Sequence, residues 1–157
     1  MAEQENLKLA KTTFETLCKA LEHRDWHFKK DEENLTIECG AQGDDLPMEI
    51  TIVVDPERML IILMSHLPFV MPDDKRIDAA VAVSAVNYAL VDGSFDYDIK
   101  SGHMIFRMSN SFRESLVGEE LFMYMILVSC HTIDEYNDKF LMLSKGMLSL
   151  EQFIEKI

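Results

Sequence analysis

The residues able to do metal or acid–base chemistry include five histidines and three cysteines. His23 and His27 are four apart, a spacing that lets two ligands share one helix face around a zinc ion. Residues 24–26 (Arg-Asp-Trp) look like a helix exit, which would separate the two rings. Cys130 and His131 are adjacent and would point to different sides of a helix. We therefore predict no structural or catalytic metal site.

Nucleophilic catalysis has no sequence pattern here either. No Gly-x-Ser-x-Gly elbow is present, and Cys18, Cys39 and Cys130 stand far apart with no local His or Asn pattern, no paired CxxC and no disulfide framework. Residues 40–43 (Gly-Ala-Gln-Gly) lead into a strand instead of a helix and lack the Lys-Ser/Thr of a phosphate loop. We predict that the protein is not an enzyme.

An alternative stays open, because a site can be assembled only in three dimensions. A small-molecule-binding or enzymatic domain would need a closed pocket with convergent polar groups, with His27, His66 and His103 as the candidates.

The acidic residues allow two interpretations. Asp92, Asp96 and Asp98 are close in sequence, but Ile99-Lys100 breaks the ligand spacing of a calcium loop, so we predict a solvated strand face. Residues 31–57 carry nine acidic side chains and no Lys or Arg. That pattern indicates either a solvent-exposed sheet face with turns, or a surface that attracts a basic segment of a partner protein.

Charge and length narrow the class of protein. The net charge of −13 over 157 residues argues against nucleic acid and anionic membranes as partners. The length fits one domain, 1–157. The opening residues lack a signal-peptide pattern, and the apolar run at 121–128 is far shorter than the roughly 20 residues of a membrane span. We expect a soluble, cytoplasmic protein.

The stretch 72–109 organises the expected fold. A helix from Asp73 to Val91, rich in small apolar residues, is predicted to be capped by Asp73, ended by Gly93 and placed in the centre of the domain. Strand 95–99, a turn at 100–102 and strand 104–108 should follow as a hairpin.

The remaining elements complete an α+β class with an antiparallel sheet and helices packed on it, in the order α-β-β-β-β-α-β-β-α. We predict a helix at 5–24, strands at 26–30, 35–40, 48–54 and 59–64, a helix at 118–145 that bends or breaks near 131–134, and a short last helix opened by a Ser149–Gln152 capping box. Gly146 should cap the long helix. Strand 59–64 is apolar on both faces, which places it centrally or at an interface.

The chain has eleven methionines. Methionine fills irregular cores, and Met-lined surfaces also suit the binding of varied peptides.

One stretch resembles a known family. Asn87-Tyr88-Ala89-Leu90, the run 93–98 (GSFDYD) and the run 101–107 (SGHMIFR), together with the end from Tyr136 to Gln152, are similar to the YbjN family, which is described as candidate bacterial sensory transduction regulators. That family resembles the type III secretion chaperones in fold. The resemblance implies the same fold and a homodimer, and it brings no catalytic residues.

We conclude that the sequence favours a non-enzymatic protein-interaction module, a chaperone-like or regulatory adaptor that binds a segment of a partner protein. We assign no catalytic, cofactor-binding or metal-binding residue and no cofactor. The apolar surface would come from strand 59–64 or the long helix.

Overall fold

Alternating apolar residues along consecutive strands build one antiparallel sheet. The computed structural model, which describes residues 1–157, has β1 (Phe28–Asp31), β2 (Thr36–Gln42), β3 (Pro47–Asp55), β4 (Leu60–His66), β5 (Ser94–Tyr97) and β6 (Met104–Ser111). The strands lie in the order β1-β2-β3-β4-β6-β5, and every neighbouring pair is antiparallel. The predicted α+β class and sheet are confirmed, and β4 lies inside the sheet as expected.

Two of the turns between these strands are closed by acidic side chains. The Asp31 carboxylate accepts hydrogen bonds from the backbone N–H groups of Glu33 and Asn34, both at 3.0 Å. Asp55 repeats this arrangement in the β3–β4 turn. Some of the acidic residues in 31–57 therefore stabilise turns by accepting backbone hydrogen bonds.

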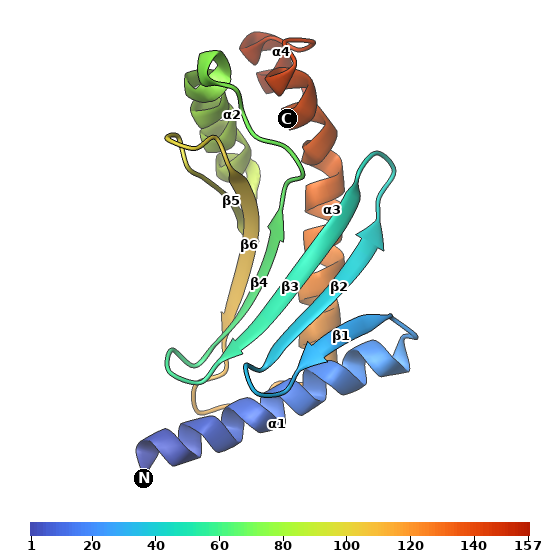
Figure 1. Ribbon diagram of the computed structural model, residues 1–157, viewed down its shortest axis with the longest axis vertical. Coiled ribbons are helices and arrows are strands. Elements are labelled where there is room, and N and C mark those ends of the chain that lie inside the picture. Colours follow the sequence, from blue (N-terminus) through green and yellow to red (C-terminus); the bar gives the residue numbers. More distant parts are fainter.

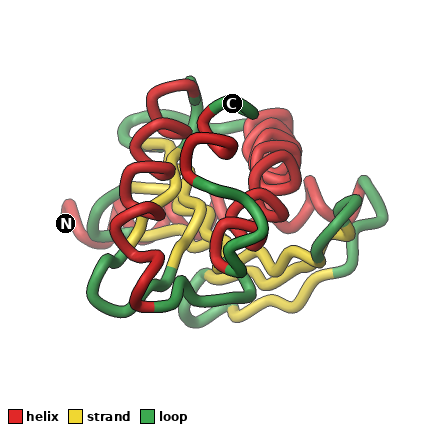
Figure 2. Tube along the Cα trace, turned by 90° about the horizontal axis from the view of Figure 1, so that it is seen from above, coloured by secondary structure: helices red, strands yellow, loops and turns green.

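Two helices cover the inner face of the sheet. The α1 helix (Ala2–His23) crosses one end of it, and α3 (Glu119–Ser144) lies behind the strands in Figure 1. Seen from above, most of the helices lie to one side of the strands (Figure 2). Phe95 of β5 lies at 5.2 Å, centroid to centroid, from both Phe106 and Phe140, in edge-on geometry that suits aromatic pairs. None of the helices is both long and apolar enough to cross a membrane.

Most of the methionines are buried in this core, which agrees with the interpretation that methionine fills an irregular core. The buried ones are Met48, Met59, Met71, Met104, Met108, Met123 and Met125.

The long helix has nearly the predicted bounds, but it is continuous. α3 runs without interruption over 26 residues, so the break predicted near 131–134 is absent. Packing on its inward side continues through that region, where Ile133, Tyr136 and Phe140 are all buried. Gly146, with φ of 68°, follows the helix in the left-handed conformation, which confirms the predicted cap.

The C-terminal end contains the predicted last helix, α4 (Leu150–Ile154). Ser149 caps it: its hydroxyl accepts from the backbone N–H of Gln152 at 3.2 Å, and the Gln152 side chain accepts from the Ser149 N–H at 2.9 Å. The capping box is confirmed.

The helix expected at the centre of the domain lies instead at its periphery. A 3₁₀ turn, η1 (Asp73–Lys75), leads into α2 (Arg76–Ala89), and only the side with Ala79, Ala82, Val83 and Val86 is buried. The prediction of a central position is wrong because a low charge content does not require that every side of a helix be covered.

The two ends of this helix also differ from the expectation. Asp73 makes no capping hydrogen bond, and its carboxylate pairs instead with Arg76 at 2.7 Å. The helix ends at Ala89, and its C-cap Leu90 is extended. Gly93, with φ of 72°, belongs to the turn before β5, where a side chain would collide with the Phe106 ring.

Candidate functional site

The histidines proposed for a polar pocket do not converge. All five histidines are exposed. His27 borders a shallow hollow over β1–β3, whereas His103 borders another at the β5–β6 turn, and β1 and β5 are the opposite edges of the sheet. No group of three His, Cys, Asp or Glu side chains is placed to hold a metal ion.

Each of the three clustered carboxylates has a structural partner. Asp96 pairs with Arg107 at 2.7 Å. Asp98 accepts from the Ser101 hydroxyl at 2.6 Å and from the Lys100 N–H at 3.0 Å, and the Ser101 hydrogen bond is the main reason why the pKa of Asp98 lies below its usual value. Asp92 accepts from the Tyr124 hydroxyl. These carboxylates fix turns and strand contacts around β5.

The cysteines are poor nucleophiles at neutral pH. Burial raises the pKa of Cys39 and of Cys130 to about 11, and burial also raises the pKa of Cys18. All three thiols are free. Since the thiolate is the reactive form, these positions suit packing better than catalysis.

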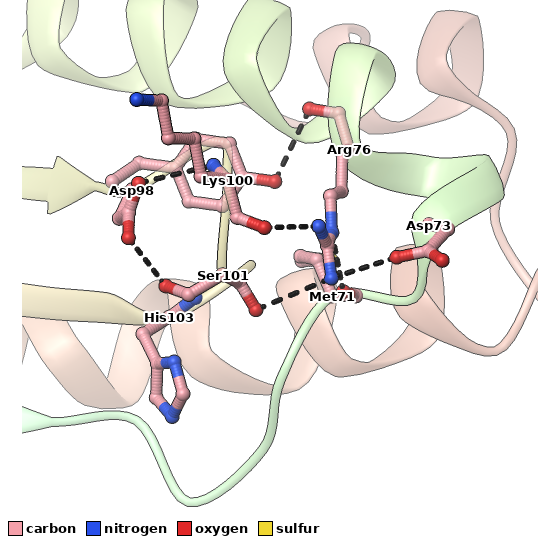
Figure 3. Close-up of polar contacts among 8 residues, drawn as sticks. Met71, Asp73, Arg76, Asp98, Lys100, Ser101 and His103 are labelled. Atoms are coloured by element: carbon pink, nitrogen blue, oxygen red, sulfur yellow. Dashed lines mark hydrogen bonds and ion pairs between the residues drawn. The ribbon is translucent and has the colours of Figure 1, made fainter.

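A polar joint positions the start of α2 against the β5–β6 turn (Figure 3). The Arg76 guanidinium donates to the backbone carbonyls of Lys100 and, at 3.4 Å, of Ser101, while it also pairs with Asp73. The Tyr97 hydroxyl donates to the Arg76 carbonyl at 3.2 Å. The guanidinium has several donors in fixed directions, so one side chain can tie the helix to two carbonyls of the turn.

A second joint fixes the other end of α2 to the free edge of β5. The Asn87 side chain donates to the Phe95 carbonyl at 2.9 Å and accepts from the Phe95 N–H at 2.8 Å. The Asn87 amide thus makes the two backbone hydrogen bonds that a further strand would make at Phe95, and it covers part of the sheet edge. Both joints hold α2 in one orientation, which decides what its outer side presents to the surroundings.

The first candidate binding surface is the sheet face opposite α1 and α3, here called the open sheet face. Its central apolar residues are half-buried and lie outside the core and the side chains packed against it: Val53, Leu60, Ile62, Met64 and Ile105. Val53 faces Ile62 across the β3–β4 pair. Glu38 and Glu49 lie exposed on β2 and β3, so the apolar strip has an acidic side. Strand β4 is therefore apolar on both faces, and only one of them is covered.

The second candidate surface is the outer side of α2, here called the α2 face. Ile77 is 67 % exposed, Val81 44 % and Tyr88 94 %. Small residues of the same helix and the side chains of Ile154 and Ile157 complete a shallow, mainly hydrophobic hollow. Large apolar side chains gathered at such exposure mark an interaction surface.

Sequence reasoning missed the α2 face, although a signal was present. The bulky residues at 77, 81 and 88 fall on one side of a helix, and the buried small ones at 79, 82, 83 and 86 fall largely on another. Sorting the helix by side-chain size would have separated the two sides. The Arg76 joint left no such signal, because its carbonyl acceptors lie more than 20 residues away in sequence.

These features define an α+β protein with a six-stranded antiparallel sheet, helices on one face and two uncovered apolar surfaces. No family model matches the sequence, and no curated protein matches it. Among solved structures, the chain is similar to YbjN from E. coli, described as a candidate transcription regulator: the TM-score is 0.58 at 15% identity, over 80% of this chain and 91% of that one.

It is also similar to one chain of the HopA1–SchA chaperone–effector complex, with a TM-score of 0.55 at 15% identity, over 81% of this chain and 95% of that one. Both likenesses concern the fold. They confirm the YbjN-like, chaperone-like fold that the resemblance implied.

Proposed function

We propose that this chain is a non-enzymatic protein-interaction module, a cytoplasmic chaperone-like or regulatory adaptor that binds a segment of a partner protein. The observation that carries the proposal is the open sheet face, where Leu60, Ile62 and Met64 of β4 meet no helix of this chain. Covering apolar area releases about 25 cal/mol per Å², so a segment bound along this strip would gain free energy from it.

Charge supports a particular kind of segment. The chain carries a net charge of −13, and Glu38 and Glu49 flank the strip without an ion-pair partner. The arginines nearest to the strip, Arg58 and Arg107, are already paired with Asp55 and Asp96. A segment that combines apolar residues with Lys or Arg would complement this face.

Two further observations support the proposal. One neighbour in fold comes from a chaperone–effector complex. The alternative, a small-molecule or enzymatic site, lacks a comparable observation, because His27 and His103 lie at opposite sheet edges and the thiols of Cys39 and Cys130 have raised pKa values. We also propose that the protein is a homodimer, as the resemblance to the secretion chaperones implies.

Photo-crosslinking tests segment binding at the open sheet face. A benzoylphenylalanine placed at Ile62 should crosslink to one partner segment in the native cells, whereas the same group at Thr12, exposed on α1, should not. Native mass spectrometry of the wild-type protein should show a stoichiometric polypeptide, and Ile62→Lys should lose it while Thr12→Lys keeps it. A retained small molecule, or equal crosslinking at both positions, would contradict the proposal.

A further inference from the structure

A hollow at one end of the open sheet face reverses the charge of the surface around it. We call it the arginine hollow, and its main lining residues are Arg58, Leu60, Ile62, Ser94, Arg107 and Ser109. No Asp or Glu lines it. By contrast, Glu38 and Glu49 line the hollow over β1–β3, and Asp96 and Asp98 line the one at the β5–β6 turn. In a chain with 28 acidic and 15 basic residues, a hollow whose charged lining is wholly basic is an exception.

The sheet and one turn bring the arginines together. Ser94 of β5 lies opposite Arg107 of β6 in the register of the sheet. Arg58 comes from the turn between β3 and β4. Arg113, just after β6, donates from its guanidinium to the Arg58 carbonyl at 3.3 Å, which holds a third positive charge at the same turn. Three of the five arginines of the chain therefore gather at one corner of the open sheet face.

The guanidinium groups keep donors that no atom of this chain accepts. Arg107 pairs with Asp96 through Nη2 at 2.7 Å, and it donates no hydrogen bond from Nε or Nη1. Arg58 meets Asp55 through Nη1 at 3.5 Å, and that carboxylate also accepts two backbone N–H groups of the turn. Both arginine side chains are more than half exposed. With the Ser109 hydroxyl at its lining, the hollow offers hydrogen-bond donors from two sides.

The arrangement of these donors favours a phosphoryl group over a carboxylate. A guanidinium fork binds two oxygens at once, and a planar carboxylate has only one pair of oxygens to present. A tetrahedral phosphoryl group has three terminal oxygens, which two forks from different elements can share. It also carries a charge of about −1.5 to −2 at pH 7, so it gains more than a carboxylate from the same arginines.

The arginine hollow is continuous with the apolar strip proposed for segment binding. Leu60 and Ile62 belong to both, and Ile62 lies opposite Ser109 in the β4–β6 register. The net charge of −13 repels a free anion. A segment held on the strip would bring its own phosphoryl group to the hollow at a high effective concentration, so an attached anion fits better than a free one.

We propose that the arginine hollow binds the phosphoryl group of a phosphorylated residue in the partner segment. Arginine clusters recognise phosphorylated segments in this way. The inference rests on the proposed function and assigns one part of the bound segment. It also orients that segment: Glu49 on β3 and Arg107 on β6 lie two strand spacings apart, about 10 Å. The Lys or Arg that meets the acidic side should therefore lie about three or four residues from the phosphorylated one.

Titration of the full chain with inorganic phosphate, followed by heteronuclear NMR at fixed ionic strength, tests the hollow without the segment. We expect saturable shifts of the Arg58 and Arg107 Nε–H signals, and about tenfold weaker binding of acetate. Arg58→Gln should raise the dissociation constant for phosphate about tenfold or more. Arg24→Gln is the matched control, because Arg24 is half exposed at the end of α1 and pairs only at 3.6 Å with Glu120.

A second pair of variants leaves every arginine in place. Ser109→Asp puts a carboxylate into the arginine hollow and should abolish the phosphate shifts, while thermal denaturation checks that the fold is kept. Ser115→Asp adds the same charge in the exposed loop before α3 and should bind phosphate like wild type.

Phosphatase treatment of the complex purified from the native cells identifies the source of the phosphoryl group. Native mass spectrometry should show a phosphorylated polypeptide that the protein loses after treatment, and Ser109→Asp should weaken its binding whereas Ser115→Asp should not.

The possible failures are distinguishable. If phosphate gives no saturable shifts, or if Arg58→Gln and Arg24→Gln weaken binding equally, the arginine hollow is not a phosphoryl site. A bound polypeptide that carries no phosphate, or that phosphatase does not release, overturns the assignment to the segment. A protein that carries no polypeptide at all overturns the proposed function and with it this source, while saturable phosphate shifts would still establish the hollow as an anion site.

Discussion

Gly102 closes the turn that Arg76 joins to α2, and replacing it with alanine tests whether this joint is as rigid as the structure implies. Its φ is +78°, a conformation that costs an alanine about 1 kcal/mol or more. A β-carbon there would overlap the Met71 carbonyl oxygen and come within 3.2 Å of its carbonyl carbon. The Met71 N–H also donates to the Gly102 carbonyl at 2.9 Å, so relieving the overlap strains that hydrogen bond.

Adding about 1 kcal/mol for the weakened hydrogen bond and a similar amount for the displaced backbone, we expect Gly102→Ala to lower the free energy of unfolding by about 3 kcal/mol. For a chain of this length that is a fall in Tm of about 6–12 °C. Urea denaturation followed by circular dichroism measures it.

Gly40→Ala is the control, because the chemical change is the same and the surroundings differ. A β-carbon at Gly40 would meet only the Met48 carbonyl oxygen at 3.6 Å, an ordinary contact, within strand β2. Alanine is favoured over glycine inside a strand by about 0.5–1 kcal/mol, so this variant should be unchanged or slightly more stable. Equal stability of the two variants would refute the reasoning.

Three further outcomes follow from single side chains. Asn87→Ala should destabilise the fold by about 2 kcal/mol and speed amide exchange at Phe95, because two hydrogen bonds to that backbone are lost; unchanged exchange would argue against the joint. The pKa of Asp45 is raised, chiefly by the charge of Asp138, so the folded state disfavours the ionised carboxyl. Asp45→Asn should therefore stabilise the protein at neutral pH, where the group is charged, and lose this advantage in denaturation curves recorded below the usual carboxyl pKa of 3.8 or in high salt. Cys39, with a pKa of about 11, should be alkylated at pH 8 much more slowly in the folded protein than in urea, as mass spectrometry of iodoacetamide-treated samples would show; equal rates would place the thiol at the surface.

Local sequence patterns predicted most of the elements. The alternation of Ile37 and Cys39 with polar neighbours indicated a half-covered strand, and both residues are buried. The capping box at Ser149 and the left-handed Gly146 were recognisable because each depends on residues within four positions of one another. Such short-range features need no knowledge of the rest of the chain.

The larger errors concern the surroundings of an element. The break expected in α3 is absent because packing of its inner side continues through 131–134. The apolar composition of the helix after Asp73 predicts a central position, yet composition does not say how many sides of a helix are covered. The same holds for the predicted polar pocket. Residue type makes His27 and His103 candidates, but the strand order places them at opposite edges of the sheet.

The sequence by itself determined the fold class, the alternation of the strands, the turns and caps, and the acidic charge, because these depend on neighbours along the chain. Only the tertiary structure decided which apolar residues remain uncovered. Ile62 and Leu63 are equally apolar neighbours in β4, but Leu63 faces the helices and Ile62 faces outward. Burial depends on what packs on each side from distant parts of the chain, so both candidate binding surfaces became visible only in three dimensions.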